Sequence, residues 1–383
     1  MSSTATTAPA TTVPATTAPA VPATTAPATT QPPPATAPPS TAPAGRDLTA
    51  IDPIVSEFVA DNGLNGAGVV VVDREDGIVH QGYWGEFSAD RVSLIASSSK
   101  MITAGVMMRL HDDGVIDIDA TVVDTVEWAM SNPEITIAQL VSNSSGLPGL
   151  TSDDASTAHV CQFFANTEIE QCSAEAFETP NDDDAVIPPD TEFRYGGVQW
   201  QIAGGIAETV TGMTWDELIQ EIYIEPCGVD SLGYNNHWLA AGGFDYPVDL
   251  DPADQTPTEN PHMEGGAYIT APDYAQLLLM HLRGGECPNG QVMSAEAIAR
   301  THEDRVLAEY GDAGPSNPGY GMGWWVDRET GQISDAGAYG SVPWLDLEDG
   351  YGVYLVVEAD SGVGNRLAQL LNPVVEAAMT AGG

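Results

Sequence analysis

Lysine is almost absent from this chain of 383 residues: Lys100 is the only lysine, and every other basic residue is an arginine. The 11 lysine and arginine residues face 55 aspartates and glutamates, which gives a formal net charge of −44 at pH 7. Charge of this size repels phosphate backbones and anionic lipid headgroups. We therefore expect no nucleic-acid partner, and we attribute the acidity to a general surface property, as in proteins adapted to high salt.

Several patterns that carry known chemistry are also missing. The sequence has no G-x-S-x-G elbow, no H-E-x-x-H motif, no glycine-rich phosphate loop and no C-x-x-C pair. The acidic runs Asp153-Asp154 and Asp182-Asp183-Asp184 lack the spacing of an EF-hand loop. The seven histidines follow no catalytic pattern, so we expect them to be mostly surface or structural. The sequence thus predicts neither a metal ion nor a cofactor.

Long apolar runs are lacking, and residues 1–45 show neither the basic start nor the apolar core of a signal peptide. These 45 residues contain no charged and no aromatic side chain, and they repeat units such as Thr-Thr-Ala-Pro-Ala. Such a segment buries too little apolar surface to fold, and its prolines favour an extended spacer. We predict a disordered linker over residues 1–45, which suits tethering to the cell envelope, a folded domain over residues 46–383, and no membrane insertion.

The four cysteines are few but even in number. Cys161 and Cys172 bracket one short segment, whereas Cys227 and Cys287 each follow a predicted helix. We predict the disulfides Cys161–Cys172 and Cys227–Cys287 and, from them, an oxidising compartment outside the cytoplasm. Four buried thiols in a cytosolic protein are the alternative.

The pattern of apolar residues predicts a segregated α+β fold. Residues 67–85 have the pattern of a β-hairpin that turns at Asp76-Gly77, and three more strands are expected over 322–327, 342–347 and 351–358. One antiparallel sheet would then combine both ends of the chain, with a mainly helical lobe inserted between them. Helices are expected over residues 47–62, 97–113, 135–143, 198–211, 215–223, 271–282, 294–301 and 365–379.

The single lysine stands three residues after Ser97 in the segment Ser97-Ser98-Ser99-Lys100. In a helix, residues three apart lie on one face, so both side chains would point the same way. A buried lysine can lose its proton near neutral pH and then accept one from a hydroxyl group, which arginine cannot do. The spacing therefore indicates an activated serine nucleophile. A surface lysine beside a serine-rich helix cap is the alternative.

The surrounding segments resemble the serine β-lactamase-like superfamily, which includes class C β-lactamases, D-alanyl-D-alanine carboxypeptidases and family VIII esterases. Residues 96–104 resemble its first motif, and residues 109–119 resemble the L-x-x-x-G-x-L-x-L-D segment that follows. Residues 136–148 resemble T-I-x-x-L-L-S-H-T-S-G-L-P, and residues 265–271 resemble G-G-L-x-S-T-A. The resemblance spans residues 51–379 and implies a β-lactamase/transpeptidase-like fold.

Two family motifs are altered in this chain. The Tyr-x-Asn motif falls on Tyr195-Gly196-Gly197, which keeps the tyrosine but replaces the asparagine that helps to hold a substrate amide. The third motif, Lys-Thr-Gly or His-x-Gly, falls on Asp335-Ala336-Gly337, so that an acid stands where the family has a cation. We expect Asp335 to repel a substrate carboxylate. The resemblance further implies that the backbone N–H groups of Ser97 and Ala338 form the oxyanion hole.

Together these features predict a secreted or envelope-bound serine hydrolase. Ser97 would form an acyl-enzyme, with Lys100 as base and Tyr195 assisting, and a carboxylesterase acting on short-chain esters is the first choice. The alternatives are a carboxypeptidase, an amidase or a weak β-lactamase. A catalytically silent relative that binds wall peptide or a partner is the alternative outside enzymes.

Overall fold

The computed structural model describes residues 46–150, 157–178, 186–242, 245–252, 258–306 and 318–381. The predicted linker of residues 1–45 and the acidic runs at 153–154 and 182–184 lie outside the described residues. The described residues all belong to one compact unit, and the fold is described for that unit alone.

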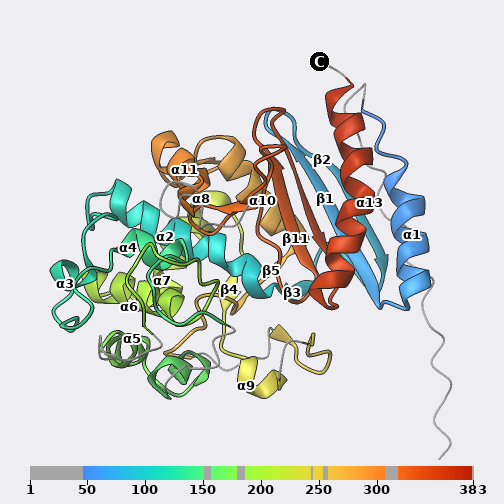
Figure 1. The fold of residues 1–383 in the computed structure, drawn as a ribbon. Coiled ribbons are helices and arrows are strands. Elements are labelled where there is room, and N and C mark those ends of the chain that lie inside the picture. The colour runs from blue at the N-terminus through green and yellow to red at the C-terminus, as the bar shows by residue number, and fades with distance from the viewer. Residues whose placement is uncertain are drawn as a thin grey trace, which may run out of the picture. The chain divides into compact units, whose positions relative to one another are not determined.

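The main sheet combines both ends of the folded region, as predicted. It has seven strands in the order β2-β1-β12-β11-β10-β9-β8, and its described neighbours pair antiparallel (Figure 1). β1 from the N-terminal part pairs directly with β12 from the C-terminal part, so the helical lobe is an insertion between segments of one sheet. The strands are β1 (Gly66–Asp73), β2 (Gly77–Gly85), β8 (Gly319–Tyr320), β9 (Trp325–Val326), β10 (Ile333–Ser334), β11 (Ser341–Asp346) and β12 (Tyr351–Val356).

The run of four valines in β1 is explained by burial on both faces of the sheet. Val69 and Val71 pack into the core beneath helices α1 (Ile51–Asn62) and α13 (Ser361–Thr380), which lie side by side on one face (Figure 1). Val70 and Val72 pack into the larger core that is shared with α10 (Ala271–Leu282) and the helical lobe. A central strand that is covered on both sides has a continuous apolar sequence, because successive side chains point to opposite faces.

The helical lobe follows the short strand β3 (Val92–Leu94), which pairs with β5 (Ala267–Thr270) and through it with β4 (Gly233–Tyr234). A further hairpin is formed by β6 (Glu286–Cys287) and β7 (Gly290–Gln291). Among the described residues, no helix is both long and apolar enough to span a bilayer. The remaining helices are α2 (Lys100–Asp112), α3 (Val122–Thr125), α4 (Ile137–Val141), α5 (Ile169–Phe177), α6 (Gln199–Thr211), α7 (Trp215–Ile219), α8 (Glu225–Cys227), α9 (Trp238–Ala241) and α11 (Ala295–His302).

Two predicted helices are interrupted in the structure. The helix expected over 97–113 begins as a 3-10 turn, η1 (Ala96–Ser99), and becomes α-helical only at Lys100. The helix expected over 215–223 passes from α7 into a π-helical turn, η3 (Gln220–Ile224), before α8. The strand expected over 322–327 is reduced to the two residues of β9.

Both predicted disulfides are confirmed. Cys161, in the 3-10 segment η2 (Thr157–Phe163), bonds to Cys172 in α5, and Cys227 at the end of α8 bonds to Cys287 in β6. The described residues contain no free cysteine. Two disulfides are compatible with an oxidising, extracytoplasmic environment.

Candidate active site

Ser97 lies in the 3-10 turn between β3 and α2, and hydrogen bonds from two neighbouring serines hold this turn in place. Ala96, the residue before it, has a positive φ of 47°, which is unfavourable for a residue with a Cβ atom. Ser98 Oγ donates to the carbonyl of Asp335 (2.6 Å), and Ser99 Oγ donates to the carbonyl of Ala96 (2.6 Å). The two buried serines fix the turn, while Ser97 itself remains half-buried and accessible.

Lys100 is fully buried and directed at Ser97. Its Nζ donates to Ser97 Oγ (3.1 Å) and to the backbone carbonyl of Glu264 (3.1 Å). The same Nζ lies 3.0 Å from the carboxylate oxygen Oε2 of Glu264 and 4.5 Å from the centre of the Tyr195 ring. The structure thus brings Ser97, Lys100 and Tyr195 together, as the sequence predicted.

The charge state of Lys100 differs from the expectation. Burial alone lowers the pKa of a lysine, but the groups around the Nζ, Tyr195 first and then the Glu264 carboxylate, outweigh burial and raise the pKa of Lys100. The expectation that Lys100 loses its proton near neutral pH is therefore not met in the free site. The lysine is an ammonium that is held in an ion pair.

Tyr195 packs in an aromatic group. Its ring stacks on Trp325 at 5.1 Å between centroids and meets Tyr320 edge to face at 6.0 Å. Burial raises the pKa of Tyr195, although the positive charge of Lys100 and a hydrogen bond with Ser97 oppose this shift. The phenol is therefore protonated near neutral pH and lies close to both Ser97 and Lys100.

The two glycines after Tyr195 replace side-chain contacts with backbone contacts. The N–H of Gly196 donates to Asn143 Oδ1 (2.9 Å), and the N–H of Gly197 donates to Glu264 Oε1 (3.0 Å). Both glycines have positive φ angles, 70° and 85°. A Cβ atom at Gly197 would lie only 2.4 Å from the carbonyl oxygen of Pro148, so an asparagine does not fit this backbone.

The expectation that the Asp335 carboxylate faces the substrate is wrong. Its side chain is fully buried, and its Oδ2 accepts a hydrogen bond from the backbone N–H of Met101 (3.1 Å) at the start of α2. Burial raises the pKa of this carboxyl well above its usual value. Asp335 therefore lies behind the turn η1 that carries Ser97 and does not line the cavity, although the neighbouring Ala336 and Ala338 do.

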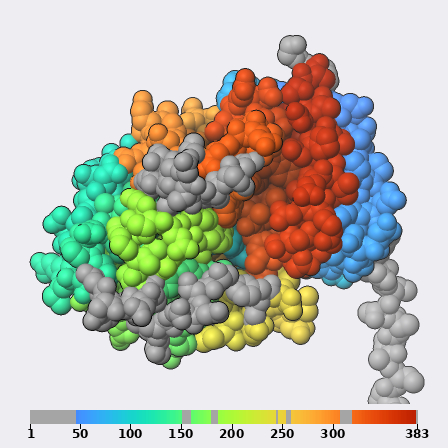
Figure 2. Space-filling model, viewed as in Figure 1, coloured from blue at the N-terminus to red at the C-terminus, as the bar shows by residue number. Residues whose placement is uncertain are grey.

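Ser97, Tyr195 and Glu264 open into a cavity of about 320 Å³ between the sheet and the helical lobe. Figure 2 shows the surface where the C-terminal strands, in red, border this lobe, in green and yellow. The predicted oxyanion residues Ser97 and Ala338 both line the cavity, and Gly337 lies against Ile95 beside it. The other lining residues are Leu150, Phe163, Trp238, His262, Trp325, Ala336, Ser361 and Asn365.

No sequence motif indicates the residues that complete this cavity. Glu264 has no place in the family motifs quoted above, and its contact with Lys100 spans 164 positions of the chain. His262 was expected to be a surface or structural histidine, yet it lines the cavity, stacked on Phe163 at 5.2 Å. Burial holds the pKa of His262 well below its usual value, so its ring is neutral. Local patterns cannot reveal such residues, because long-range packing alone brings them to the site.

Known proteins match both the sequence and this geometry. The family model described as Beta-lactamase matches residues 51–373 of the chain. The chain belongs to the β-lactamase family. Penicillin-binding protein 4 of Amycolatopsis lactamdurans is 26% identical over 307 residues, which cover 75% of this chain and 77% of that protein.

Solved structures share the β-lactamase-family fold. EstCE1, described as a hydrolase with promiscuous acyltransferase activity, superimposes with a TM-score of 0.70 and 17% identity over 85% of this chain and 97% of that chain. The octameric penicillin-binding protein homologue from Pyrococcus abyssi superimposes with a TM-score of 0.63 and 17% identity over 86% of this chain and 77% of that chain. The predicted α+β, β-lactamase/transpeptidase-like fold is thereby confirmed.

Proposed function

We propose that this β-lactamase-family protein is a serine hydrolase that forms an acyl-enzyme at Ser97 and acts on neutral short-chain esters. The observation that carries the proposal is the 3.1 Å contact between Lys100 Nζ and Ser97 Oγ at the floor of an open cavity. A serine with a basic group in hydrogen-bond reach is the usual arrangement of an activated nucleophile.

In the proposed reaction, Ser97 Oγ attacks the ester carbonyl and its proton passes to Lys100. The backbone N–H groups of Ser97 and Ala338, which both line the cavity, would stabilise the oxyanion. Tyr195 lies beside both groups and would relay the proton to the leaving alcohol. Water then hydrolyses the acyl-enzyme. None of these steps requires a metal ion or a cofactor.

The lining of the cavity supports a preference for neutral substrates. Leu150, Phe163, Trp238 and Trp325 supply apolar walls, and Glu264 is the one acidic lining residue that the structure describes. Among the described lining residues there is no arginine or lysine that could pair with a substrate carboxylate. This lack of a cation replaces the expected repulsion by Asp335 as the reason to favour esters over carboxylate-bearing amides.

The test combines covalent labelling with turnover. A fluorophosphonate should add one adduct to wild type and none to Ser97→Ala, measured by intact mass, with p-nitrophenyl butyrate and nitrocefin assayed in parallel. Wild type should hydrolyse the butyrate ester with the higher kcat/KM. Faster hydrolysis of nitrocefin would favour a β-lactamase or carboxypeptidase instead, and a wild type without adduct or turnover would indicate a silent binding relative.

We also place this activity outside the cytoplasm, in a secreted or envelope-tethered protein. The two disulfides support this assignment. The charge of −44 further supports small-molecule substrates over nucleic acids as partners.

A further inference from the structure

The carboxylate of Glu264 occupies the centre of the site, and its two oxygens have different neighbours. Oε1 accepts the hydrogen bond from the N–H of Gly197 (3.0 Å), whereas Oε2 lies 3.0 Å from Lys100 Nζ. The Glu264 side chain is only 3% exposed, yet it reaches the cavity that Ser97 lines. A buried carboxylate thus lies between the Tyr195-Gly196-Gly197 motif and Lys100. Gly197 has no side chain that could make this contact instead.

The two glycines and the glutamate depend on one another. A Cβ atom at Gly196 would lie 2.4 Å from Glu264 Oε2, so a side chain at this position would displace the carboxylate from Lys100. Position 197 is a glycine where the family has an asparagine, and the Glu264 carboxylate lies beside the lysine instead. The altered motif accommodates a carboxylate from another part of the chain.

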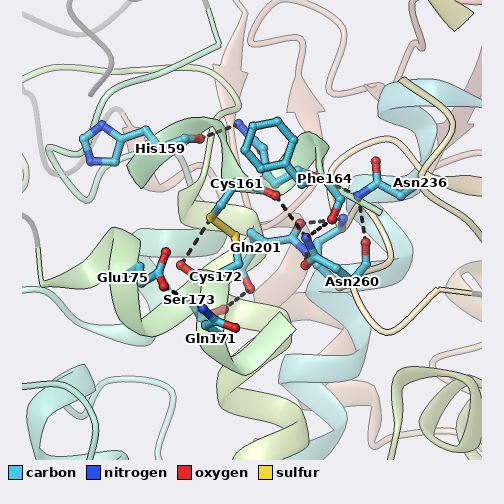
Figure 3. Close-up of a disulfide and its surroundings, with 12 residues drawn as sticks. His159, Cys161, Phe164, Gln171, Cys172, Ser173, Glu175, Gln201, Asn236 and Asn260 are labelled. Carbon is cyan, nitrogen blue, oxygen red and sulfur yellow. Dashed lines mark hydrogen bonds between the residues drawn. A yellow bond between two sulfur atoms is a disulfide. The ribbon is translucent and has the colours of Figure 1, made fainter. Parts of the chain in front are cut away.

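A second set of contacts fixes the segment that carries Glu264. Gln201 of α6 donates from Nε2 to Asn260 Oδ1 (2.7 Å) and to the carbonyl of Pro261 (2.7 Å), and its Oε1 accepts from the N–H of Met263 (3.1 Å). Asn260 in turn donates to the carbonyl of Cys161 (3.0 Å), which joins the segment to the disulfide-bonded loop (Figure 3). The backbone just before Glu264 is therefore anchored, and the carboxylate itself is held by its contacts with Gly197 and Lys100.

We propose that Glu264 is the proton acceptor that converts Lys100 into a base. The inference rests on the proposed function, because it explains how an ammonium group can activate Ser97. In the ion pair, Lys100 has no lone pair with which to take the serine proton. Glu264 removes this obstacle by accepting one proton from Lys100 across the 3.0 Å contact. The burial of both groups favours the transfer, because a site without water disfavours both charges of the pair.

The steps balance in protons and electrons. Lys100 gives a proton to Glu264, which leaves a neutral amine and a neutral carboxyl group. Ser97 gives its proton to that amine as Oγ forms the bond to the ester carbonyl carbon. When the carbon–oxygen bond to the leaving alkoxide breaks, the proton on Lys100 passes to the alkoxide, directly or through Tyr195. Glu264 then returns its proton to Lys100, and the ion pair is restored.

The other titratable groups that face this pair do not compete for the proton. Burial holds the pKa values of Tyr195, Tyr320 and Asp335 above their usual values and that of His262 below its usual value, so each is kept toward its uncharged form. Glu264 is the group in direct ion-pair contact with Lys100 in the part of the chain that the structure describes.

The test is the pH dependence of Ser97 acylation by a fluorophosphonate, followed by intact mass. In wild type the proton stays within the pair, so the rate should fall only at acidic pH. Glu264→Gln keeps the shape and an acceptor for Gly197 but removes the charge, so Lys100 must lose its proton to solvent. The acid limb, which is the pH range over which the acylation rate falls, should then move up by more than about one pH unit. The acylation rate at neutral pH should drop roughly tenfold or more and should recover in alkali. Glu208→Gln, which removes a half-buried carboxylate elsewhere in the lobe, should leave the profile unchanged.

Other outcomes overturn the inference. If the acid limb of Glu264→Gln stays in place or moves to lower pH, Glu264 has only a structural role. The proposed function would still stand in that case, provided that Ser97→Ala is not labelled. If Glu264→Gln does not fold, the pH profile of wild-type acylation tests the inference by itself. A wild-type acid limb in the pH range where lysines titrate would exclude Glu264 as the acceptor. Formate should rescue Glu264→Ala and formamide should not; equal rescue by both contradicts a role in proton transfer. If wild type is not labelled at any pH, the proposed function and this inference fail together.

Discussion

Asp335 Oδ2 accepts a hydrogen bond from the backbone N–H of Met101, and this 3.1 Å contact ties the third motif to the first turn of α2. The acid therefore supports the helix that follows Ser97 and does not line the cavity. A hydrogen bond to an N–H of the first turn satisfies a donor that has no partner within the helix.

Exchange of Asp335 for a cation should accordingly destabilise the protein and leave substrate preference unimproved. Asp335→Lys would bury a second positive charge near Lys100, at a cost of roughly 3–5 kcal/mol. Asp335→Asn keeps an acceptor for Met101 and should cost less than about 1.5 kcal/mol. Thermal unfolding measures both. A stable Asp335→Lys variant with improved nitrocefin turnover would show that this side chain does reach the substrate.

Lys100→Arg should be nearly as inactive as Lys100→Ala. Arginine keeps the positive charge beside Glu264, but it cannot give up its proton and then take one from Ser97. Loss of a general base lowers kcat by roughly 10²–10⁴-fold. The measurement is kcat for p-nitrophenyl butyrate, with circular dichroism as the control for folding. An arginine variant that keeps most of its kcat would reduce the lysine to an electrostatic role.

The two disulfides should have different effects on catalysis. Removal of Cys161–Cys172, which closes 11 residues, should cost about 3 kcal/mol, and removal of Cys227–Cys287, which closes 60, about 4 kcal/mol. Phe163 of the cavity wall lies in the same short segment as Cys161. Paired Cys→Ala changes at 161 and 172 should therefore raise KM several-fold, whereas those at 227 and 287 should lower stability with little change in KM. Urea unfolding and steady-state kinetics test this, and equal KM values would contradict it.

Glu358 should make stability depend on pH in acid. Burial opposes its charge, but hydrogen bonds from Arg91, Ser93 and Asn65 outweigh burial and lower the pKa of Glu358. A lowered pKa in the folded state stabilises the protein above the unfolded-state pKa of about 4.5, and this contribution is lost as the pH falls through the folded-state value.

Glu358→Gln should therefore be less stable by roughly 2–4 kcal/mol at neutral pH and lose less stability on acidification. The measurement is the free energy of unfolding in urea from neutral pH down to about pH 3. Asp76→Asn, which breaks the exposed ion pair with Arg46, is the control and should change stability by less than about 1 kcal/mol. If the free energy of unfolding falls in parallel with pH for wild type and Glu358→Gln, this carboxylate is not the source of the acid dependence of stability.

Local signals explain which parts of the fold could be predicted. α10 occupies residues 271–282 as expected, because Thr270 caps its first turn and the apolar residues follow one face. The hairpin of β1 and β2 follows from the valine run and the Asp76-Gly77 turn. Strands β8, β9 and β10 have two residues each, which is too short for any alternation to show in the sequence.

Within the site, spacing identified Ser97 and Lys100 but not the environment that sets their chemistry. Nothing near Lys100 in the sequence indicates that Glu264 faces it, and burial was expected to act on the lysine alone. The position of Asp335 was not predictable either, because a motif gives the order of residues and not the side of the strand to which each side chain points. The motif comparison shows only that Gly197 lacks the asparagine side chain, whereas the structure shows a backbone donor for Glu264.

The complete burial of the chain's single lysine turns the active site into its own reporter of local unfolding. A lysine-specific protease has one peptide bond to cut in the whole sequence, between Lys100 and Met101, at the junction of η1 and α2. Cleavage requires this junction to open, so its rate under native conditions measures the free energy of exposing the nucleophile turn. A substrate analogue that binds against Ser97 would slow the cut in proportion to its occupancy, and binding could be followed without any turnover.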